Sequence, residues 1–295
     1  MASTVSSVLL KILKKHGIRH IFGLPAAQIG LLMDGAGKDP YFNYITTRHE
    51  EAAGHMAHAI GKMTDGMAVC FATVGPGATN LVPGVAAAWA DNIPMLVITP
   101  DNQQDSIEPG KDLLQNANQL ELYRAITKWN ATIHTAARAG ELIERAIHIA
   151  RSGRPGPVHL NIPCDVGTAP CDHDVDSLPN IRRPRPVPTA DEISAMADLL
   201  ASAKRPVLLA GGGVVRAEGI EEFRALVNMT GFPATTTAHA RGVVPFECAT
   251  HVGSSGVLGG WGVAESLSES DVLLAVGCKF SSFLPLNKPP LYPLK

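Results

Sequence analysis

This chain of 295 residues has no large excess of acidic or basic residues, and it has no long apolar runs. The formal net charge is −2, from 25 basic and 27 acidic residues, so neither nucleic acid nor an anionic membrane is indicated as a partner. No apolar run approaches the roughly 20 residues that a membrane-spanning helix needs. The first residues, MASTVSSVLLKILKKHG, lack a basic stretch before their apolar part and predict a helix instead of a signal peptide. We therefore expect a cytoplasmic protein.

Cysteines are few, and their number is odd. The five are Cys70, Cys164, Cys171, Cys248 and Cys278. Their scatter favours reduced thiols over a disulfide framework. Cys70 and Cys278 lie in apolar runs and are expected in the core. Cys164 and Cys171 could bind a metal together with His173, but no Cys-x-x-Cys spacing accompanies them, so no metal site is predicted.

With 45% hydrophobic residues, the chain can bury a sizeable core, and its length suggests about two domains. Strand patterns alternate with helix patterns up to about residue 165. Expected strands lie at 20–23, 42–47, 67–73, 95–99, 129–133 and 158–162, and expected helices at 5–16, 25–33, 50–63, 79–90 and 136–151. This alternation indicates βαβ units around a parallel sheet. We predict a three-layer α/β domain over 1–167.

A second α/β domain, apparently incomplete, is predicted over 189–280, with helices at 191–203 and 220–230 and strands at 206–210 and 271–276. The stretch 168–188 is rich in Pro and Asp and predicts a linker, and 281–295 forms a Pro-rich tail. The turn Gly211-Gly212-Gly213 follows a strand, where it could face a dinucleotide. A purely structural turn fits the same pattern.

Residues 44–63 predict a buried strand that runs into a helix, with Glu50 at the junction. Tyr44, Ile45, Thr46 and Thr47 favour an extended chain, and apolar residues then recur at helical spacing. Because ligands bind at the carboxyl ends of parallel strands, Glu50 is a candidate functional residue. A charge that only stabilises the first turn of a helix explains its position equally well.

A second candidate is Gly75-Pro76-Gly77-Ala78-Thr79-Asn80, which follows a buried strand and opens a helix. Such a turn lets the backbone approach a ligand closely. It lacks the third glycine of the dinucleotide fingerprint, so a nucleotide site is only weakly indicated. A bare structural turn is the alternative.

Taken together, these motifs resemble a known family. They are Phe22-Gly23-Leu24-Pro25, Arg48-His49-Glu50, Ala72 to Asn80, Asp91-Asn92-Ile93-Pro94 and Gly153 to Val158. Their order and spacing are similar to those of the thiamine-diphosphate enzymes of the acetolactate synthase and 2-oxo acid decarboxylase superfamily, over residues 4 to about 280. The resemblance implies a pyrimidine-binding domain followed by a central domain. No match to the Gly-Asp-Gly and Asn-Asn segment that holds Mg²⁺ and the diphosphate is found, so we expect those ligands on an absent third domain.

The resemblance also implies roles for individual residues. Glu50 would activate the cofactor, because a carboxyl bonded to the aminopyrimidine favours the imino form that removes the thiazolium proton. Cofactor-binding residues would be Pro25, Glu50, Thr73, Gly75, Pro76, Gly77 and Asn80. For Asn80, a role in securing the turn is favoured. Ala26, Ala27 and Gln115 would border the substrate. Leu114 and Asn116 depart from the Phe-Gln-Glu segment of the synthases, which puts an acetolactate-type pocket in doubt.

The implied function is that of a thiamine-diphosphate carboligase or lyase acting on 2-oxo acids or related carbonyl compounds, as a homodimer or homotetramer or with a separate diphosphate-binding subunit. No His-His pair supports a simple pyruvate decarboxylase. The alternative is a catalytically silent partner subunit or fragment that lacks the diphosphate domain, and by itself the chain is expected to be inactive. FAD in the central domain is left open, and an oxidoreductase built on Gly211 to Gly213 is disfavoured because no ribose-binding acid follows at the expected spacing.

Overall fold

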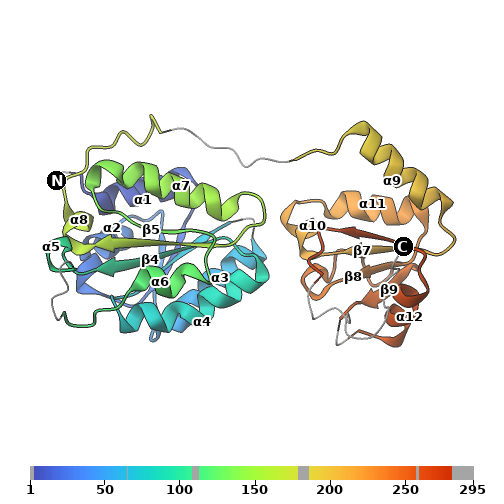
Figure 1. Ribbon diagram of the computed structural model, residues 1–295, viewed down its shortest axis with the longest axis horizontal. Coiled ribbons are helices and arrows are strands. Elements are labelled where there is room, and N and C mark those ends of the chain that lie inside the picture. The colour runs from blue at the N-terminus through green and yellow to red at the C-terminus, as the bar shows by residue number, and fades with distance from the viewer. Residues whose placement is uncertain (1–2, 65, 108–112, 179–185, 257–258, 281–295) are drawn as a thin grey trace. The chain divides into compact units, whose positions relative to one another are not determined.

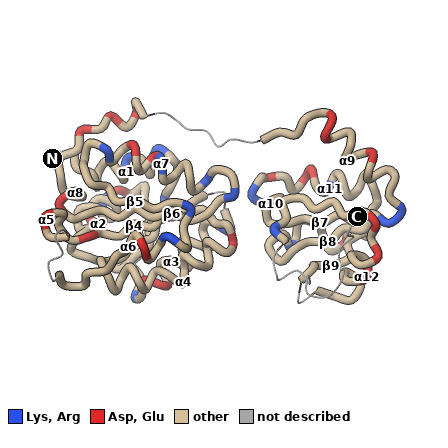
Figure 2. Tube along the Cα trace, viewed as in Figure 1, with Lys and Arg blue, Asp and Glu red and all other residues tan. Residues whose placement is uncertain are grey.

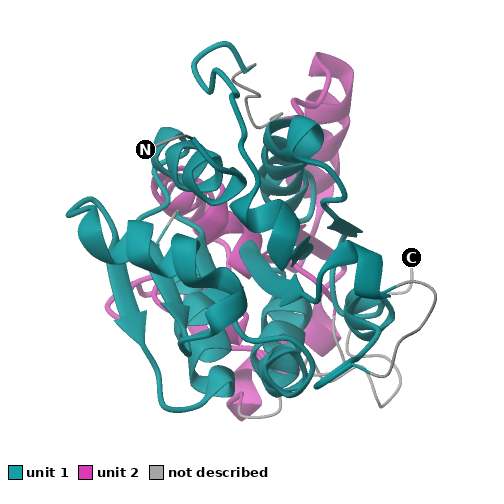
Figure 3. Ribbon diagram, turned by 90° about the vertical axis from the view of Figure 1, so that its left-hand side faces the viewer, with its two compact units in different colours: residues 1–185 teal, residues 186–295 magenta. Residues whose placement is uncertain are grey.

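A computed structural model of the chain describes residues 3–64, 66–107, 113–178, 186–256 and 259–280. Its contacts divide the chain into two compact units, Met1–Arg185 and Pro186–Lys295 (Figures 1 and 3). Each unit contains a parallel sheet with helices packed against it. The predicted α/β fold class is therefore confirmed.

The sheet of the first unit has the order β2-β1-β3-β4-β6-β5. Its strands are β1 (His20–Gly23), β2 (Asn43–Thr46), β3 (Ala68–Phe71), β4 (Met95–Asp101), β5 (Asn130–Thr132) and β6 (Pro157–Pro163). All neighbouring pairs are parallel. After β1 the chain moves outward to β2 and then returns past β1 to β3. The carboxyl ends of β1 and β3 therefore form a topological switch point, the place where open α/β sheets bind ligands.

The helices of the first unit follow signals that the sequence carries. They are α1 (Val5–Lys15), α2 (Gly30–Lys38), α3 (Glu50–Met63), α4 (Pro76–Asp91), α5 (Gln104–Ile107), α6 (Gln119–Arg124), α7 (Ala139–Arg151) and α8 (Cys164–Thr168), with short 3-10 turns at Ala27–Ile29 and Ala136–Arg138. Thr4 caps α1 in a reciprocal box with Ser7, and Gly17 follows the helix with a φ of 70°. Pro76 begins α4, where its missing N–H costs nothing.

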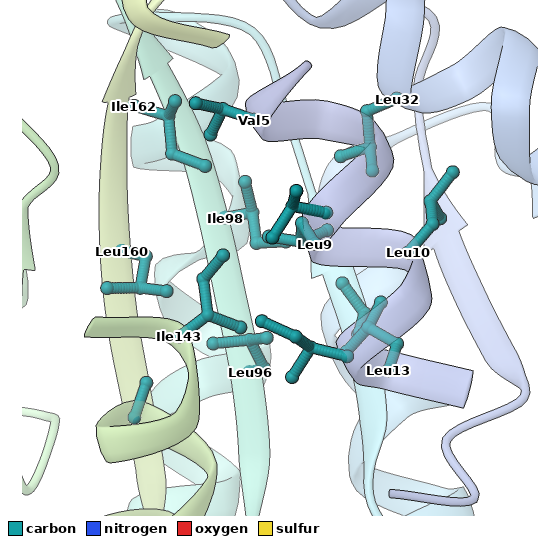
Figure 4. Packing of buried hydrophobic residues seen from close by; sticks show 14 of the residues in the cluster. Val5, Leu9, Leu10, Leu13, Leu32, Leu96, Ile98, Ile143, Leu160 and Ile162 are labelled. Atoms are coloured by element: carbon teal, nitrogen blue, oxygen red, sulfur yellow. The ribbon is translucent and has the colours of Figure 1, made fainter. Parts of the chain in front are cut away.

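Helices cover both faces of the sheet because its central strands are apolar on both sides. On β3, Val69 and Phe71 belong to the cluster formed with α1, α2 and α7, whereas Ala68 and Cys70 belong to the cluster formed with α3 and α4. Figure 4 shows part of the first cluster, in which Leu9 and Leu13 of α1 lie beside strand residues. The result is the predicted three-layer arrangement.

Strand β2 corrects one expectation. The sequence predicts a buried strand from Tyr44, but β2 is the edge strand, and three of its four residues are exposed, Ile45 by 44%. Aromatic and β-branched residues favour an extended backbone without requiring burial on both faces. The position of the strand in the sheet decided its exposure.

Part of the predicted linker packs against the first unit. Cys171 and Val175 are buried, the Cys171 amide donates to the Ser3 carbonyl (2.9 Å), and Lys15 Nζ donates to the Val175 carbonyl (3.1 Å). Residues 168–178 are thus tied to α1. The remainder of the predicted linker up to residue 185 and the tail at 281–295 lie outside the described residues.

The second unit has a sheet of order β10-β7-β8-β9. Its elements are α9 (Ala190–Ser202), β7 (Pro206–Ala210), α10 (Gly212–Arg216), α11 (Ile220–Thr230), β8 (Ala234–Thr236), β9 (His251–Ser254), α12 (Trp261–Glu269) and β10 (Val272–Val276), with a 3-10 turn at Ala238–Ala240. Strand β7 and helix α11 occupy the predicted ranges. Strands β8 and β9 and helices α10 and α12 were not predicted from the sequence.

The glycine turn after β7 has a packing explanation. A Cβ atom on Gly211 would lie 2.3 Å from the Gly277 carbonyl oxygen, and one on Gly213 would lie 2.7 Å from Gly277 Cα. The amide of Gly213 donates to the same carbonyl (2.9 Å). These glycines therefore let the chain after β10 cross the turn after β7.

The five cysteines are free thiols. Cys70 is buried as expected, but Cys278 is only half-buried, which corrects its predicted core position. Cys171 Sγ donates to the Ala136 carbonyl (3.3 Å), and His173 Nε2 lies 2.9 Å from the Ala137 carbonyl oxygen. Two of the three side chains of the hypothetical metal group, Cys171 and His173, thus contact the backbone of the turn before α7.

Acidic and basic residues are mixed along both units (Figure 2). Helix α4 is an exception, since its only charged residue is the last one, Asp91. Within the described ranges, no helix is both long enough and apolar enough to cross a membrane.

Candidate active site

Three loops that carry predicted site residues leave neighbouring strands at the switch point. Pro25 follows β1, Glu50 follows β2 and Thr73 follows β3. The Thr47 amide donates to the Gly23 carbonyl (3.0 Å), which holds the first two loops together. Because parallel strands end at the same edge of a sheet, these residues gather in one place.

Glu50 is the first residue of α3, and His49 caps this helix by accepting from the Glu51 amide. The Glu50 residue is only 5% exposed, whereas the side chain of Glu51 is 48% exposed. Asn80 Nδ2 donates to Glu50 Oε2 (3.0 Å). A buried carboxylate needs such a partner, so Glu50 differs from an ordinary surface charge in the first turn of a helix.

The same bond changes the interpretation of Asn80. The sequence favoured a role for this residue in securing its own turn, but its amide reaches across to α3. The turn is instead held by Thr79, whose amide donates to the Gly75 carbonyl (2.9 Å) and whose hydroxyl donates to the Pro76 carbonyl (2.8 Å). Asn80 therefore joins α4 to the candidate catalytic carboxylate.

Gly77 lies close to that carboxylate, where a side chain would not fit. A Cβ atom at this position would lie 3.2 Å from Glu50 Oε1 and 2.8 Å from Thr73 Cγ2. Any side chain here would press on both groups. Gly75 caps α4 with a φ of 66°, a conformation that glycine adopts without strain.

The loop after β1 is connected to the loop after β3. Thr73 Oγ1 donates to Gln28 Oε1 (3.1 Å). Pro25 and Ala27 are exposed, but Ala26 is buried and packs in the core cluster with α1. Sequence reasoning did not identify Gln28, and its place three residues after Pro25 was the only available signal.

Gln115 comes to the same site from a distant part of the chain. A Cβ atom on Gly75 would lie 2.0 Å from the Gln115 carbonyl oxygen, so the two backbones touch. Gln115 is exposed and has a φ of 61°. Predicted residues of the cofactor and substrate groups are thus brought together by the contacts of Glu50 with Asn80 and Gly77 and of Gly75 with Gln115, whereas Ala26 packs into the core beside α1.

Two features at this edge fit a bound aminopyrimidine. The first is the buried Glu50 carboxyl beside Gly77, where a Cβ atom would lie only 3.2 Å from Glu50 Oε1. The second is Thr47, whose buried Oγ1 has no hydrogen-bond partner in the described part of the chain. A buried polar atom without a partner calls for a ligand or a water molecule.

The chain belongs to the thiamine pyrophosphate enzymes. Residues 3–122 match the family description "Thiamine pyrophosphate enzyme, N-terminal TPP binding domain", and residues 193–294 match the description of the central domain of the same enzymes. The first match contains the whole site described above. The suspected resemblance is thereby confirmed.

Similar proteins share this part of their length with the chain. An acetolactate synthase of Mycobacterium bovis is 35% identical over 280 residues, which are 94% of this chain and 45% of the relative. A probable acetolactate synthase large subunit of Methanocaldococcus jannaschii is 35% identical over 281 residues, 94% of this chain and 47% of the relative. The chain therefore spans a little under half the length of the relatives it matches.

Proposed function

We propose that this chain supplies the cofactor-activating part of an acetolactate synthase-like enzyme that acts on 2-oxo acids or related carbonyl compounds. The observation that carries the proposal is the buried Glu50 at the switch point, with Asn80 bonded to one of its oxygens. The relatives named acetolactate synthase support the reaction class. Carboligation, lyase chemistry and decarboxylation all belong to this reaction class.

Each site residue has a definite task in this proposal. The Glu50 carboxyl would hold a proton at a ring nitrogen of the aminopyrimidine, and Asn80 would fix the orientation of that carboxyl. Thr73, Gly75, Pro76 and Gly77 would form the wall beside the rings. Thiamine diphosphate, when bound, supplies a carbanion that attacks the substrate carbonyl and then accepts the electrons of the broken bond.

In this proposal the described residues serve only the pyrimidine side of this cofactor. No group of three or more His, Cys, Asp or Glu residues in the described ranges is arranged to hold a metal ion. We propose that Mg²⁺ and the diphosphate are held by a further domain or subunit. The glycines after β7 pack against Gly277, so we propose no dinucleotide at that turn, and FAD in the central domain forms no part of the proposal.

On the substrate side we propose Ala27 and Gln115, since both are exposed at this edge. Ala26 would support them from the core. Leu114, which precedes Gln115 in the chain, is apolar and 85% exposed. These residues would face the part of the substrate that does not react.

Helix α4 supports an oligomeric enzyme. It carries no charge before Asp91, and its exposed positions include Pro83, Ala90 and Trp89, the last 41% exposed. Surface helices normally present a charged face to water. We propose that a second copy of the chain covers α4 in a homodimer.

Calorimetric titration with thiamine diphosphate and Mg²⁺ tests the function, first with the chain alone and then with a separately expressed diphosphate domain. Exchange of the C2 proton of the cofactor, followed by NMR, reports activation. We expect Glu50→Gln to slow this exchange about 100-fold or more in the mixture, as for loss of an acid–base group. Glu51→Gln is the matched control, since this neighbour is half exposed, and it should exchange at the wild-type rate.

The silent-partner alternative predicts a different result. If the wild-type mixture is stable but neither binds the cofactor nor promotes exchange, the catalytic proposal fails and an association role remains. Sedimentation of the chain alone tests the homodimer separately, because Ala90→Glu on α4 should convert a dimer into a monomer.

A further inference from the structure

Gln119, the first residue of α6, belongs to a buried hydrogen-bond chain that the proposed function does not use. It is 1% exposed, and its Nε2 donates to the Pro100 carbonyl (2.8 Å) and to Asn161 Oδ1 (3.0 Å). Asn161 Nδ2 in turn donates to Asp101 Oδ2 (2.6 Å). These bonds tie the start of α6 to β4 and β6.

The chemistry of Asp101 sets the direction of the whole chain of bonds. A carboxylate oxygen accepts, so Asn161 presents Nδ2 to it and Oδ1 to Gln119, which must then present Nε2. Thr99 Oγ1 also donates to Asn161 Oδ1 (3.1 Å), so the His159 nitrogen 2.7 Å from Thr99 Oγ1 is the donor to it. Only one arrangement of donors and acceptors satisfies these contacts.

Four residues before Gln119, the backbone of Gln115 has an unfavourable conformation. Gln115 has a φ of 61°, which side-chain-bearing residues rarely adopt, and its carbonyl oxygen touches Gly75. Such a conformation persists only where the surrounding structure determines it. Within residues 113–118, the Asn116 amide donates to the Leu113 carbonyl (3.3 Å), a weak bond that cannot fix the turn alone.

We propose that Gln119 is a positioning residue that holds the turn 113–118 against Gly75. Through this contact it would set the width of the site beside Gly77 and Glu50 and aim the Gln115 side chain at the substrate. The effect of Gln119 on ligand binding rests on the proposed function. The positioning itself is a property of this chain and can be measured without any ligand.

Hydrogen exchange in the full chain, followed residue by residue by NMR, tests the positioning. Gln119→Leu removes both bonds of Nε2, and we expect exchange at the Asn116 and Leu122 amides to rise about tenfold or more, as expected for loss of two neutral bonds. Exchange at the β4 amides should stay unchanged. Thr132→Val is the matched control, because it removes another bond of Asn161 Nδ2 (3.3 Å) and leaves both bonds of Gln119 Nε2 in place.

A purely structural role for Gln119 predicts that exchange rises equally in β4 and in the turn, and that result, or no change at all, overturns the proposal. If Gln119→Leu does not fold, Gln119→Met, which keeps the length of the side chain, takes its place.

Calorimetry with thiamine diphosphate, Mg²⁺ and the diphosphate domain adds a second readout. Gln119→Met or Leu should weaken binding several-fold and Thr132→Val should not. If wild type does not bind, the proposed function fails, but the exchange data still decide the positioning.

Discussion

Gly84 of α4 lies directly against Gly54 of α3. A Cβ atom on Gly84 would come within 2.6 Å of the Gly54 carbonyl carbon and 2.8 Å of the His55 amide nitrogen. Glu50 precedes Gly54 by one helical turn, and Asn80 precedes Gly84 by one turn, so each pair shares a helix face. The glycine contact therefore fixes the spacing at which Asn80 can donate to Glu50.

Gly84→Ala should push the two helices apart. A methyl group has no space between these backbones, and overpacking typically costs about 1–3 kcal/mol of unfolding free energy. The Glu50 to Asn80 bond should lengthen as well. Urea unfolding measures the stability loss, and cofactor titration of the mixed domains measures the effect on the site.

Gly37→Ala is the control for this substitution. Gly37 is also helical, but a Cβ atom there would meet only Tyr44 Cδ1, at an ordinary 3.7 Å. We expect it to raise stability by about 0.5–1 kcal/mol, since alanine favours a helix. Equal effects at positions 37 and 84 would contradict the close helix contact.

Asn80→Ala should destabilise the chain by removing the partner of a buried carboxylate. Bonds to charged groups contribute about 1.5–3 kcal/mol, and we expect the lower end because Asn80 is half-buried. Thr79→Ala lies in the same turn and removes only an exposed bond to the Pro76 carbonyl. If the two variants unfold at the same urea concentration, Asn80 does not support Glu50 as the structure indicates.

Much of the fold follows from local sequence pattern. Strands β1 and β7 and helix α11 occupy the ranges that the sequence predicts. Each is an apolar or periodic segment with turn residues at its ends. Strand β8 (Ala234–Thr236) and strand β9 (His251–Ser254) were missed, since each is short and has no apolar run. The exposure of β2 depends on strand order, which no local pattern contains.

The candidate site divides in the same way. Glu50 and the Gly75 to Asn80 turn are visible in the sequence, because they stand at strand-to-helix junctions within ordered motifs. Gly84, Gln28 and Gln119 were not found. Their roles depend on contacts between elements that are distant in sequence, and each residue alone is an unremarkable glycine or glutamine.

Gln115→Gly should raise stability in spite of adding chain flexibility. Glycine removes the cost of about 1–2 kcal/mol that a left-handed conformation imposes on an L-residue, while its own flexibility costs about 0.5–1 kcal/mol. The net gain should be visible in the thermal midpoint. Ala86→Gly, inside α4, should instead lose about 1 kcal/mol. A loss of stability at position 115 would mean that its positive φ is not strained.

The buried His159 should make the first unit sensitive to acid. Its side chain is fully buried, its ring stacks on Tyr123 with centroids 4.2 Å apart, and its Nδ1 has no partner among the described residues. Burial lowers the pKa of His159 from 6.5 to about 3. The folded chain therefore keeps this ring neutral at a pH where the unfolded chain takes up a proton.

The sign of the pH dependence follows from this difference. Above pH 6.5 both states hold a neutral ring, so His159 adds no slope. Between pH 6.5 and about 3, the unfolded state binds one more proton, and the unfolding free energy should fall by up to about 1.4 kcal/mol per pH unit.

His159→Gln keeps a hydrogen-bond donor for Thr99 but cannot titrate. Urea unfolding of both proteins from pH 8 to pH 4 should show curves that run parallel above pH 6.5 and converge below it, because only wild type loses this contribution. A difference between the two curves that stays constant over the whole range would show that His159 is not held neutral in the core.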